Sequence, residues 1–229
     1  MFLWKAEVLP GVSVAFTDTR AGNLALHVGD SPDGVRARRE ELERGAGMVP
    51  GSLRFMNQVH GTAVAVMEAG SETPESDAMV SCGVPLAVMV ADCIPAVLVG
   101  QGAAGPVLAA VHAGRPGLAA GVIPAAVEQM RALGAGGIQA WLGPSICGAC
   151  YEVPAALRED VAAAIPATWS TTSWGTPGLD LPAGARSQLQ AAGVDIMYSG
   201  PCTLENGDLF SYRRNKDTGR FAGLVWSHD

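Results

Sequence analysis

The sequence has little charge and no basic surplus. Only 16% of its 229 residues are charged, 48% are hydrophobic, and the formal net charge is −7. This composition is typical of a compact globular protein with little disorder. Proteins that bind nucleic acid need a basic patch or stripe, so the acidic balance argues against DNA or RNA as a partner. It still allows a small phosphorylated ligand that is held by local arginines.

Long hydrophobic segments are also missing. The apolar stretch at residues 84–99 is too short for a membrane span, and it contains Asp92 and two prolines. Residues 1–11 carry two charged side chains where a secretory signal has its apolar core. We therefore expect a cytoplasmic protein without a membrane partner.

The five cysteines form no compact metal motif, and their number is odd. A chain of this size buries roughly 70% of its unfolded surface, so it needs no disulfide, and we expect reduced thiols. One Cys-x-x-Cys pair, Cys147 and Cys150, lacks the second pair of a zinc ribbon. It is redox-active, half of a metal site or, as we expect, part of a packed turn.

Repeats and low-complexity linkers are absent, which predicts a single domain over residues 1–229. Short apolar runs bounded by glycine and proline predict buried strands at 63–67, 86–90, 96–99, 107–111 and 138–142. Helical patterns occur at 33–44, 117–133, 154–164 and 182–192, and Pro124 requires a kink or a late start in the second of these. Residues 70–77 predict a surface loop. Strands mixed with helices predict an α/β or α+β fold.

Histidine is scarce, yet two of the four histidines stand beside predicted strands. His60 precedes one strand, whereas Cys93 and His112 each follow another. Loops converge at strand ends in α/β proteins, so the three side chains are candidates for one site. Their spacing along the chain is long and is weak evidence by itself. The alternative is a packed cysteine and two hydrogen-bonded loop histidines.

Two chemistries use two imidazoles and a thiol. Together they bind Zn²⁺ and leave a fourth position open for water, whose pKa the metal lowers towards 7. Alternatively, one histidine activates Cys93 as a nucleophile. Asp92 beside it needs a partner if buried, and it is a candidate for proton transfer, for orienting a ligand or for capping a loop. Residues 211–220 hold three arginines and a lysine, which predict an anion patch or a solvated turn.

Seven segments, in order, resemble those of the bacterial YfiH-like family, which includes the laccase domain-containing proteins described as multicopper polyphenol oxidases. They are HVGD (27–30), NQVHG (57–61), SDAMVS (76–81), ADCIPAVL (91–98), VHAG (111–114), GPSICGACYEV (143–153) and FSYRRNKDTGRFAGLVW (210–226). The resemblance implies a layered α/β/β/α sandwich with mixed β-sheets. It also implies that His60, Cys93 and His112 bind zinc, with copper as an alternative metal.

The resemblance also implies a function. Family members are described as purine nucleoside phosphorylases that act on adenosine, inosine, guanosine and methylthioadenosine, and as adenosine deaminases. The implied partners are a small-molecule nucleoside and phosphate. Two alternatives are a Cys-His hydrolase that edits peptidoglycan precursors and a copper-dependent polyphenol oxidase (laccase), for which four histidines are few. Nothing in the sequence predicts the oligomeric state.

The implied site residues match this sequence with some departures. The catalytic set is His60, Cys93, His112 and Asp92, and the substrate-binding candidates are Asn23, Arg39, Gln58 and Arg115. The usual His-Ala-Gly-Trp-Arg-Gly segment is HAGRPG here, so Arg115 takes the tryptophan position and Pro116 the arginine position. Arg115 is therefore the candidate replacement for the family arginine. Arg38 stands where asparagine is usual.

Overall fold

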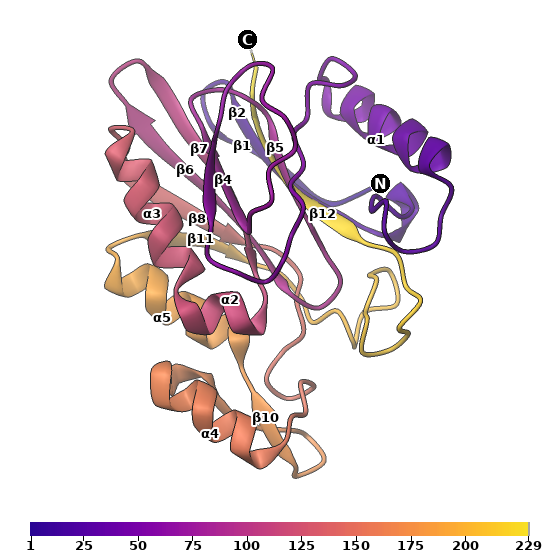
Figure 1. The fold of residues 1–229 in the computed structure, drawn as a ribbon, viewed down its shortest axis with the longest axis vertical. Coiled ribbons are helices and arrows are strands. Elements are labelled where there is room, and N and C mark those ends of the chain that lie inside the picture. Colours follow the sequence, from indigo (N-terminus) through magenta and orange to yellow (C-terminus); the bar gives the residue numbers. More distant parts are fainter. Residues whose placement is uncertain (229) are drawn as a thin grey trace.

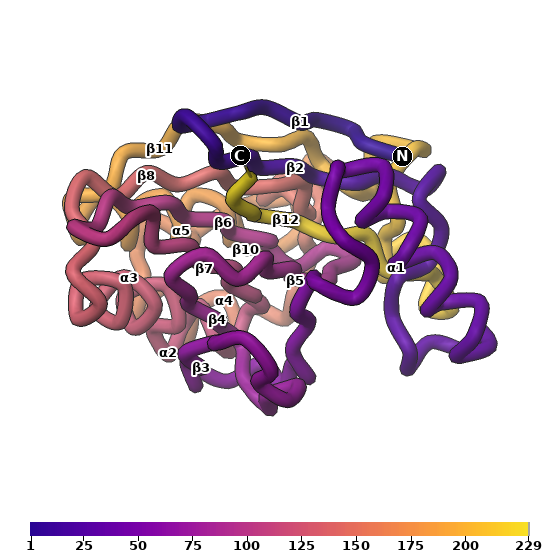
Figure 2. The backbone as a smooth tube through the Cα atoms, turned by 90° about the horizontal axis from the view of Figure 1, so that it is seen from above, coloured from indigo at the N-terminus to yellow at the C-terminus, as the bar shows by residue number. Residues whose placement is uncertain are grey.

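The computed structural model describes residues 1–228 and consists of two β-sheets packed face to face, with helices on both outer sides. Figure 1 shows the helices grouped at the two flanks of the sheets, and Figure 2 shows the same layers from above. The predicted α/β/β/α sandwich with mixed sheets is confirmed. Within residues 1–228, no helix is long and apolar enough to cross a membrane.

The first sheet has four antiparallel strands, in the order β1 (Phe2–Leu9), β2 (Val12–Thr17), β12 (Phe221–Ser227) and β5 (Leu86–Val90). A short 3-10 turn, η1 (Thr19–Ala21), follows β2. Helix α1 (Pro32–Ala46) covers the outer face of this sheet, where Leu42 packs in one cluster with Leu224 and Trp226. The last strand of the chain, β12, pairs with β2 on one side and β5 on the other, so it lies in the interior of the sheet.

The second sheet has six strands, in the order β11 (Asp195–Ser199), β8 (Gly136–Leu142), β6 (Ile94–Gly102), β7 (Gly105–Ala113), β4 (Ala78–Ser81) and β3 (Val64–Met67). Its two outer pairs are parallel and the inner ones antiparallel. Its outer face is covered by α2 (Arg115–Ala120), α3 (Val122–Ala132) and α5 (Leu181–Ala191). At one end lie α4 (Ala155–Ala164), η2 (Pro166–Thr168) and the hairpin of β9 (Trp169–Thr171) and β10 (Pro177–Leu179).

Strand β6 shows why the apolar runs are continuous rather than alternating. Successive side chains of a strand point to opposite faces. Ala96 and Leu98 face the helices, whereas Val97 and Val99 face the other sheet. Because both faces are buried, every position of the strand favours an apolar side chain.

The five predicted strands are present as β3, β5, β6, β7 and β8, and residues 70–77 form the predicted loop. The helix predicted at 117–133 is instead two helices, which break at Gly121 with φ +92°. Pro124 lies in the first turn of α3, where its missing N–H removes no helical bond. Strands β1, β2, β4 and β9 to β12 were not predicted.

Candidate active site

The three predicted metal ligands lie at the junction of the two sheets. His60 precedes β3, His112 is the penultimate residue of β7, and Cys93 lies between β5 and β6. Since β5 belongs to one sheet and β6 to the other, residues 91–93 carry the chain across the interface between them. The ligand atoms of the three side chains all lie within 4.8 Å of one another. Cys93 Sγ is 3.8 Å from His60 Nε2, and the centroids of the two imidazole rings are 4.7 Å apart.

Asp77, fully buried directly before β4, holds both histidines in place. One carboxylate oxygen accepts from the backbone N–H of His60 at 2.9 Å, and the other accepts from the N–H groups of Val59 at 3.2 Å and Gly61 at 2.6 Å. The backbone N–H of His112 donates to the carbonyl of Asp77 at 2.7 Å. Asp77 thus fixes the loop that carries His60 and the position of His112 in β7.

The same carboxylate sets the orientation of the His112 ring. Its Oδ1 lies 2.7 Å from His112 Nδ1. A carboxylate only accepts, so Nδ1 carries the proton and Nε2 is left to face Cys93. Burial would raise the pKa of Asp77, but the hydrogen bonds from His112 and the Gly61 N–H outweigh it and hold that pKa low. Asp77 is therefore a permanent anion behind the ring.

The pKa values of Cys93 and His112 shift in opposite directions, because each residue favours the charged form of the other. Burial would raise the pKa of the Cys93 thiol, but the charge of His112 and hydrogen bonds from both histidines lower it to about 6. Burial would likewise lower the pKa of His112, but the Cys93 thiolate and Asp77 raise it to about 9. At neutral pH the sulfur is thus a thiolate, the form that binds metals or attacks a substrate.

The backbone is strained at two points of the site. Within residues 1–228, the non-glycine residues with positive φ are His60 at 62° and Asp92 at 86°. Such conformations cost of order 1–3 kcal/mol and persist only where the surroundings enforce them. Asp77 enforces the first through its three backbone contacts, and the partners of the Asp92 carboxylate enforce the second.

Gly114, between β7 and α2, leaves the space that the His60 ring occupies. A Cβ at this position would lie 2.6 Å from His60 Cδ2 and 3.3 Å from Cys93 Sγ. We expect Gly114→Ala to displace the ring and to lower the affinity of the cluster for a metal, tested with zinc, about tenfold or more, because small misplacements of ligands are costly. Competition with a chromophoric chelator measures this affinity. The matched control is Gly207→Ala, whose Cβ would meet nothing within 4 Å; an equal effect in both variants contradicts the prediction.

Two cavities meet at this cluster and share His60, Ala91, Cys93 and Tyr212 among their lining residues. The first has a volume of about 410 Å³ and is lined further by Tyr151, Arg115, Arg213 and Lys216. The second has about 350 Å³ and is lined further by His27, Gln58, His112 and Arg220. A small polar ligand in either cavity would contact the cluster, and cations on both sides favour an anionic group.

Asp92 lines the first cavity, and both of its carboxylate oxygens have partners. Oδ1 accepts from the hydroxyl of Thr203 at 2.5 Å, and Oδ2 accepts from the backbone N–H of Arg213 at 2.6 Å. The Asp92 carbonyl accepts from the N–H of Ile146 at 3.0 Å. Asp92, directly before Cys93, is thus bonded to the segment that holds Thr203 and Arg213 and to the loop that holds Ile146. Ile146 and Arg213 also line the first cavity.

The predicted substrate-binding residues divide into two groups. Arg115, the first residue of α2, lines the first cavity. Gln58 lines the second, where its amide bonds to the backbone N–H and carbonyl of Met89 at 3.0 Å and 2.7 Å. Asn23 and Arg39 line neither cavity.

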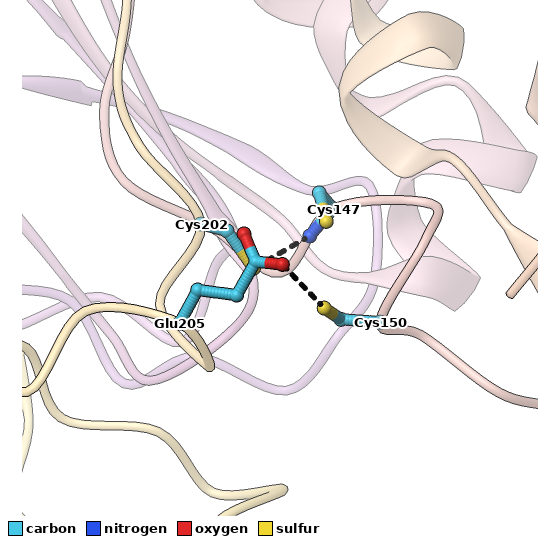
Figure 3. A group of neighbouring side chains, drawn as sticks. All are labelled: Cys147, Cys150, Cys202 and Glu205. Atoms are coloured by element: carbon cyan, nitrogen blue, oxygen red, sulfur yellow. Dashed lines mark hydrogen bonds between the residues drawn. The ribbon is translucent and has the colours of Figure 1, made fainter. Parts of the chain in front are cut away.

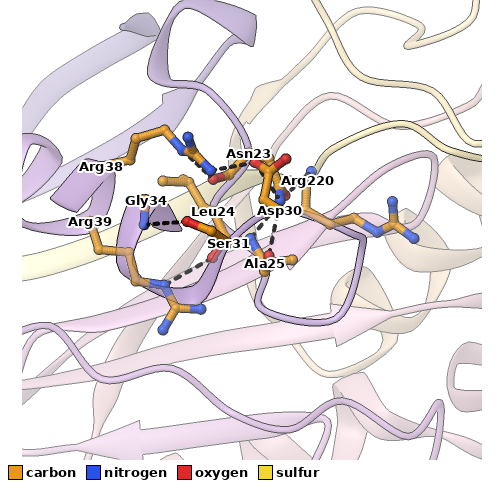
Figure 4. A network of polar contacts seen from close by, with 9 residues as sticks. All are labelled: Asn23, Leu24, Ala25, Asp30, Ser31, Gly34, Arg38, Arg39 and Arg220. Atoms are coloured by element: carbon orange, nitrogen blue, oxygen red, sulfur yellow. Dashed lines mark hydrogen bonds and ion pairs between the residues drawn. The ribbon is translucent and has the colours of Figure 1, made fainter. Parts of the chain in front are cut away.

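Asn23 joins two segments of the backbone. Its side chain bonds to both backbone groups of Ala25 and accepts from the N–H of Arg220 at 2.9 Å, so it ties the loop after η1 to β12 (Figure 4). Arg39 donates to the carbonyl of Leu24 at 2.9 Å and stacks 3.7 Å from the centroid of Phe55. It lines a third cavity, which shares His27 and Met89 with the second. Figure 4 shows the Arg220 side chain leaving this network on the side opposite Arg38 and Arg39.

Several residues at the site were missed by the sequence analysis. Asp77 lies within the quoted segment SDAMVS, but its loop position concealed that it is buried. Tyr212 and Arg220 belong to the basic segment 211–220, which was interpreted only as an anion patch or a turn. Asp77, Tyr212 and Arg220 all lie in segments that resemble the family, and this resemblance could have pointed to them.

Comparison with known proteins identifies the family of the chain. Residues 9–228 match the model of a family described as multi-copper polyphenol oxidoreductase laccase. The chain is 50% identical to a Streptomyces griseus protein named purine nucleoside phosphorylase ORF3, with 96% of each chain covered. It is 37% identical to the Shigella flexneri purine nucleoside phosphorylase YfiH, with 95% of each covered. The crystal structure of Neisseria meningitidis protein NMB0706 is similar with a TM-score of 0.85 at 34% identity, covering 100% of this chain and 99% of that one. The chain therefore belongs to the laccase-domain family of YfiH-like proteins, as the segments around His60, Cys93 and His112 predicted.

Proposed function

We propose that the protein is a metal-dependent purine nucleoside phosphorylase, which transfers the ribose of a nucleoside from the purine to phosphate. The observation that carries the proposal is the cavity of about 410 Å³ that joins the His60–Cys93 edge of the cluster to the cations Arg115, Arg213 and Lys216. Its relatives' names, purine nucleoside phosphorylase, support the same reaction.

The residues present fit a zinc ion. Imidazole nitrogen and thiolate sulfur are the ligands that zinc prefers, and three of them leave one position open. The three ligand atoms lie within 4.8 Å of one another, and Asp77 orients His112 from behind, as carboxylates do at many zinc-binding histidines. Zinc bound there would supply a Lewis acid that polarises a substrate atom in the cavity. Copper binds the same kinds of ligand.

In phosphorolysis, a phosphate oxygen attacks C1′ of the ribose while the bond between C1′ and the purine nitrogen breaks. Catalysis then depends on positioning the phosphate and stabilising the charge that develops on the sugar. We assign Arg115, Arg213 and Lys216 to the phosphate, because they are the cations of the first cavity. Tyr151 and Tyr212 offer aromatic faces in the same cavity, on which a purine ring can stack.

We propose adenosine deamination as a second reaction of the same cavity, in which water adds to C6 of adenine and ammonia leaves. The step needs a group that moves a proton between the water and the leaving amine. Asp92 is the carboxylate that lines the first cavity, and we assign this proton transfer to it. Its bonds to Thr203 and Arg213 hold the carboxylate at a fixed place beside the substrate.

Product analysis of zinc-loaded protein tests both reactions. We expect inosine to yield hypoxanthine and ribose 1-phosphate only when phosphate is present, and adenosine to yield inosine without phosphate. Guanosine and methylthioadenosine are expected to undergo phosphorolysis in the same way. If fully zinc-loaded protein converts none of these nucleosides, the proposed function is wrong.

The phosphate assignment has its own test. We expect Arg115→Gln to raise the KM for phosphate about tenfold and to leave the KM for inosine nearly unchanged, because a hydrogen bond to a charged group contributes about 1.5–3 kcal/mol. Arg36→Gln is the matched control, since Arg36 lies on α1 and pairs with Asp33. If the KM for phosphate is unchanged in Arg115→Gln, the phosphate is bound by other cations and the assignment to Arg115 is wrong.

A cysteine hydrolase acting on peptidoglycan precursors is the second candidate. It is favoured by the lowered pKa of Cys93, about 6, and by the contact of its Sγ with His60, the arrangement of an activated nucleophile. A laccase is less well supported. Among residues 1–228, the groups able to hold a metal contain two histidines in all, and both belong to the single His-Cys-His cluster. The Cys93 experiment in the Discussion distinguishes the hydrolase from the metal-dependent enzyme.

A further inference from the structure

Three cysteines and a glutamate outside the candidate active site form a second cluster. Cys147, Cys150, Cys202 and Glu205 place their ligand atoms within 4.8 Å of one another. Figure 3 shows the four side chains converging from two loops that lie far apart in the sequence. We propose that this cluster is a second, structural zinc site.

The composition of the cluster fits four-coordinate zinc. Three thiolates and a carboxylate complete a tetrahedron without water, which is the pattern of a structural rather than a catalytic site. With zinc–sulfur bonds of about 2.3 Å, tetrahedral sulfurs lie about 3.8 Å apart, so the cluster needs to contract only slightly. A disulfide would use two of the thiols and leave the third unpaired, whereas all five cysteines are free thiols here.

Hydrogen bonds hold the two loops in a conformation that brings the four side chains together. Residues 147–150 form a tight turn, in which the N–H of Cys150 donates to the carbonyl of Cys147 at 3.0 Å. Gly148 lets this turn pass close to Asp180, because a Cβ there would lie 2.6 Å from Asp180 Cβ. The N–H of Cys147 donates to Cys202 Sγ at 3.4 Å, and Cys150 Sγ donates to Glu205 Oε1 at 3.5 Å. The first of these bonds, from a backbone N–H, orients the Cys202 sulfur, and the second holds the side chains of Cys150 and Glu205 together.

The two loops are also joined beside the cluster. Ser145 and Cys202 form an isolated β-bridge, in which Ser145 N–H donates to Pro201 at 3.3 Å and Thr203 N–H donates to Ser145 at 3.1 Å. The same loops carry Ile146 and Tyr151 of the first cavity and Thr203, the partner of Asp92. An ion at the cluster would therefore fix the wall of the cavity, whichever reaction takes place there.

Metal analysis of reduced, anaerobically reconstituted protein tests the site. We expect wild type to retain a second zinc equivalent, which His60→Asn also retains while losing the first. Asparagine is chosen because it tolerates the positive φ of His60. We expect Cys147→Ser and Cys202→Ser to lose the second equivalent, and Cys82→Ser, whose exposed thiol belongs to neither cluster, to lose nothing.

Cobalt provides a signature that a purely structural role of the cysteines would not give. In His60→Asn, we expect Co²⁺ to produce the strong thiolate-to-metal absorption of several sulfur ligands, and Cys202→Ser to weaken it. Should the serine variants fail to fold, Glu205→Gln replaces an exposed side chain and is expected to lower affinity about tenfold or more. The proposal is overturned if His60→Asn binds no zinc, if Glu205→Gln binds it unchanged, or if the isolated protein contains a disulfide within the cluster instead of metal. None of these outcomes depends on the nucleoside activity.

Discussion

Asp77→Asn is expected to lower both the zinc affinity and the stability of the protein. The asparagine keeps the volume of the side chain but turns an NH2 group towards donors, namely His112 Nδ1 or the N–H groups of Val59 and Gly61. Removing one partner of a buried ion pair costs about 3–5 kcal/mol. Loss of the group that orients a metal-binding histidine lowers metal affinity by about 10- to 100-fold.

Two measurements separate these effects. Denaturant unfolding of metal-free protein reports the stability, and zinc competition at a temperature where the variant is folded reports the affinity. Asp33→Asn is the matched control, because it removes the same charge from an exposed side chain of α1. If zinc affinity in Asp77→Asn equals that of the control, Asp77 supports the loops without orienting His112 for a metal.

Cys93→Ser is expected to abolish zinc binding at the active site and to lower kcat/KM for nucleoside phosphorolysis about 10³-fold or more. A serine hydroxyl is a poor replacement for thiolate as a zinc ligand. A metal that polarises the substrate contributes several kcal/mol to the transition state, and each 1.36 kcal/mol corresponds to about tenfold in rate. Chelation of the wild-type protein should reproduce the loss, and added zinc should restore activity in wild type but not in the variant.

The same experiment distinguishes the metal-dependent enzyme from the cysteine hydrolase. Zinc is expected to protect Cys93 from alkylation, because its sulfur is then a ligand. Cys82→Ser is the control, since its exposed thiol lies outside the cluster. Activity on a peptidoglycan precursor that survives chelation but ends when Cys93 is alkylated would support the hydrolase instead.

Residue patterns alone predicted much of the layered core. Strands β5 to β8 contain continuous apolar runs, because most of their residues are buried on both faces, and such runs are visible in a sequence. Strands β1 and β11 are only half-buried and mix polar with apolar residues, so their pattern is weaker. The helical stretch breaks at Gly121 and not at Pro124, because proline is tolerated in the first turn of a helix.

The break in the apolar run was predicted almost correctly. Cys93 does lie between two strands, but β6 begins at Ile94 and therefore includes Pro95, which the prediction left outside. Pro95 has no N–H to donate, but its carbonyl accepts from the N–H of Gly143 at 2.9 Å. Strands β5 and β6 belong to different sheets. This depends on tertiary contacts, which a local sequence pattern does not predict.

The convergence of His60, Cys93 and His112 was expected chiefly from the family resemblance, since their spacing is long. The contribution of Asp77 depends on contacts that β4 makes with residues distant in sequence, so local reasoning had no access to it. Asn23 and Arg39 were predicted to bind substrate for the same family reason. In the structure their side chains bond to Ala25 and Leu24 and lie outside the two cavities at the cluster, so substrate binding by these two residues stays a prediction.

The position of β12 between β2 and β5 has a consequence for how the protein folds. Leu224 pairs with Ala15 on one side and Ala87 on the other, so the four-stranded sheet is incomplete until nearly opposite ends of the chain have met. Such non-local pairing slows folding and leaves the edges of β2 and β5 open to other chains in the meantime. Arg220 directly precedes β12, and Cys93 follows β5. The late step that closes the sheet is thus also the step that brings these two residues to one cavity, so a partly folded chain is expected to be inactive as well as prone to aggregate.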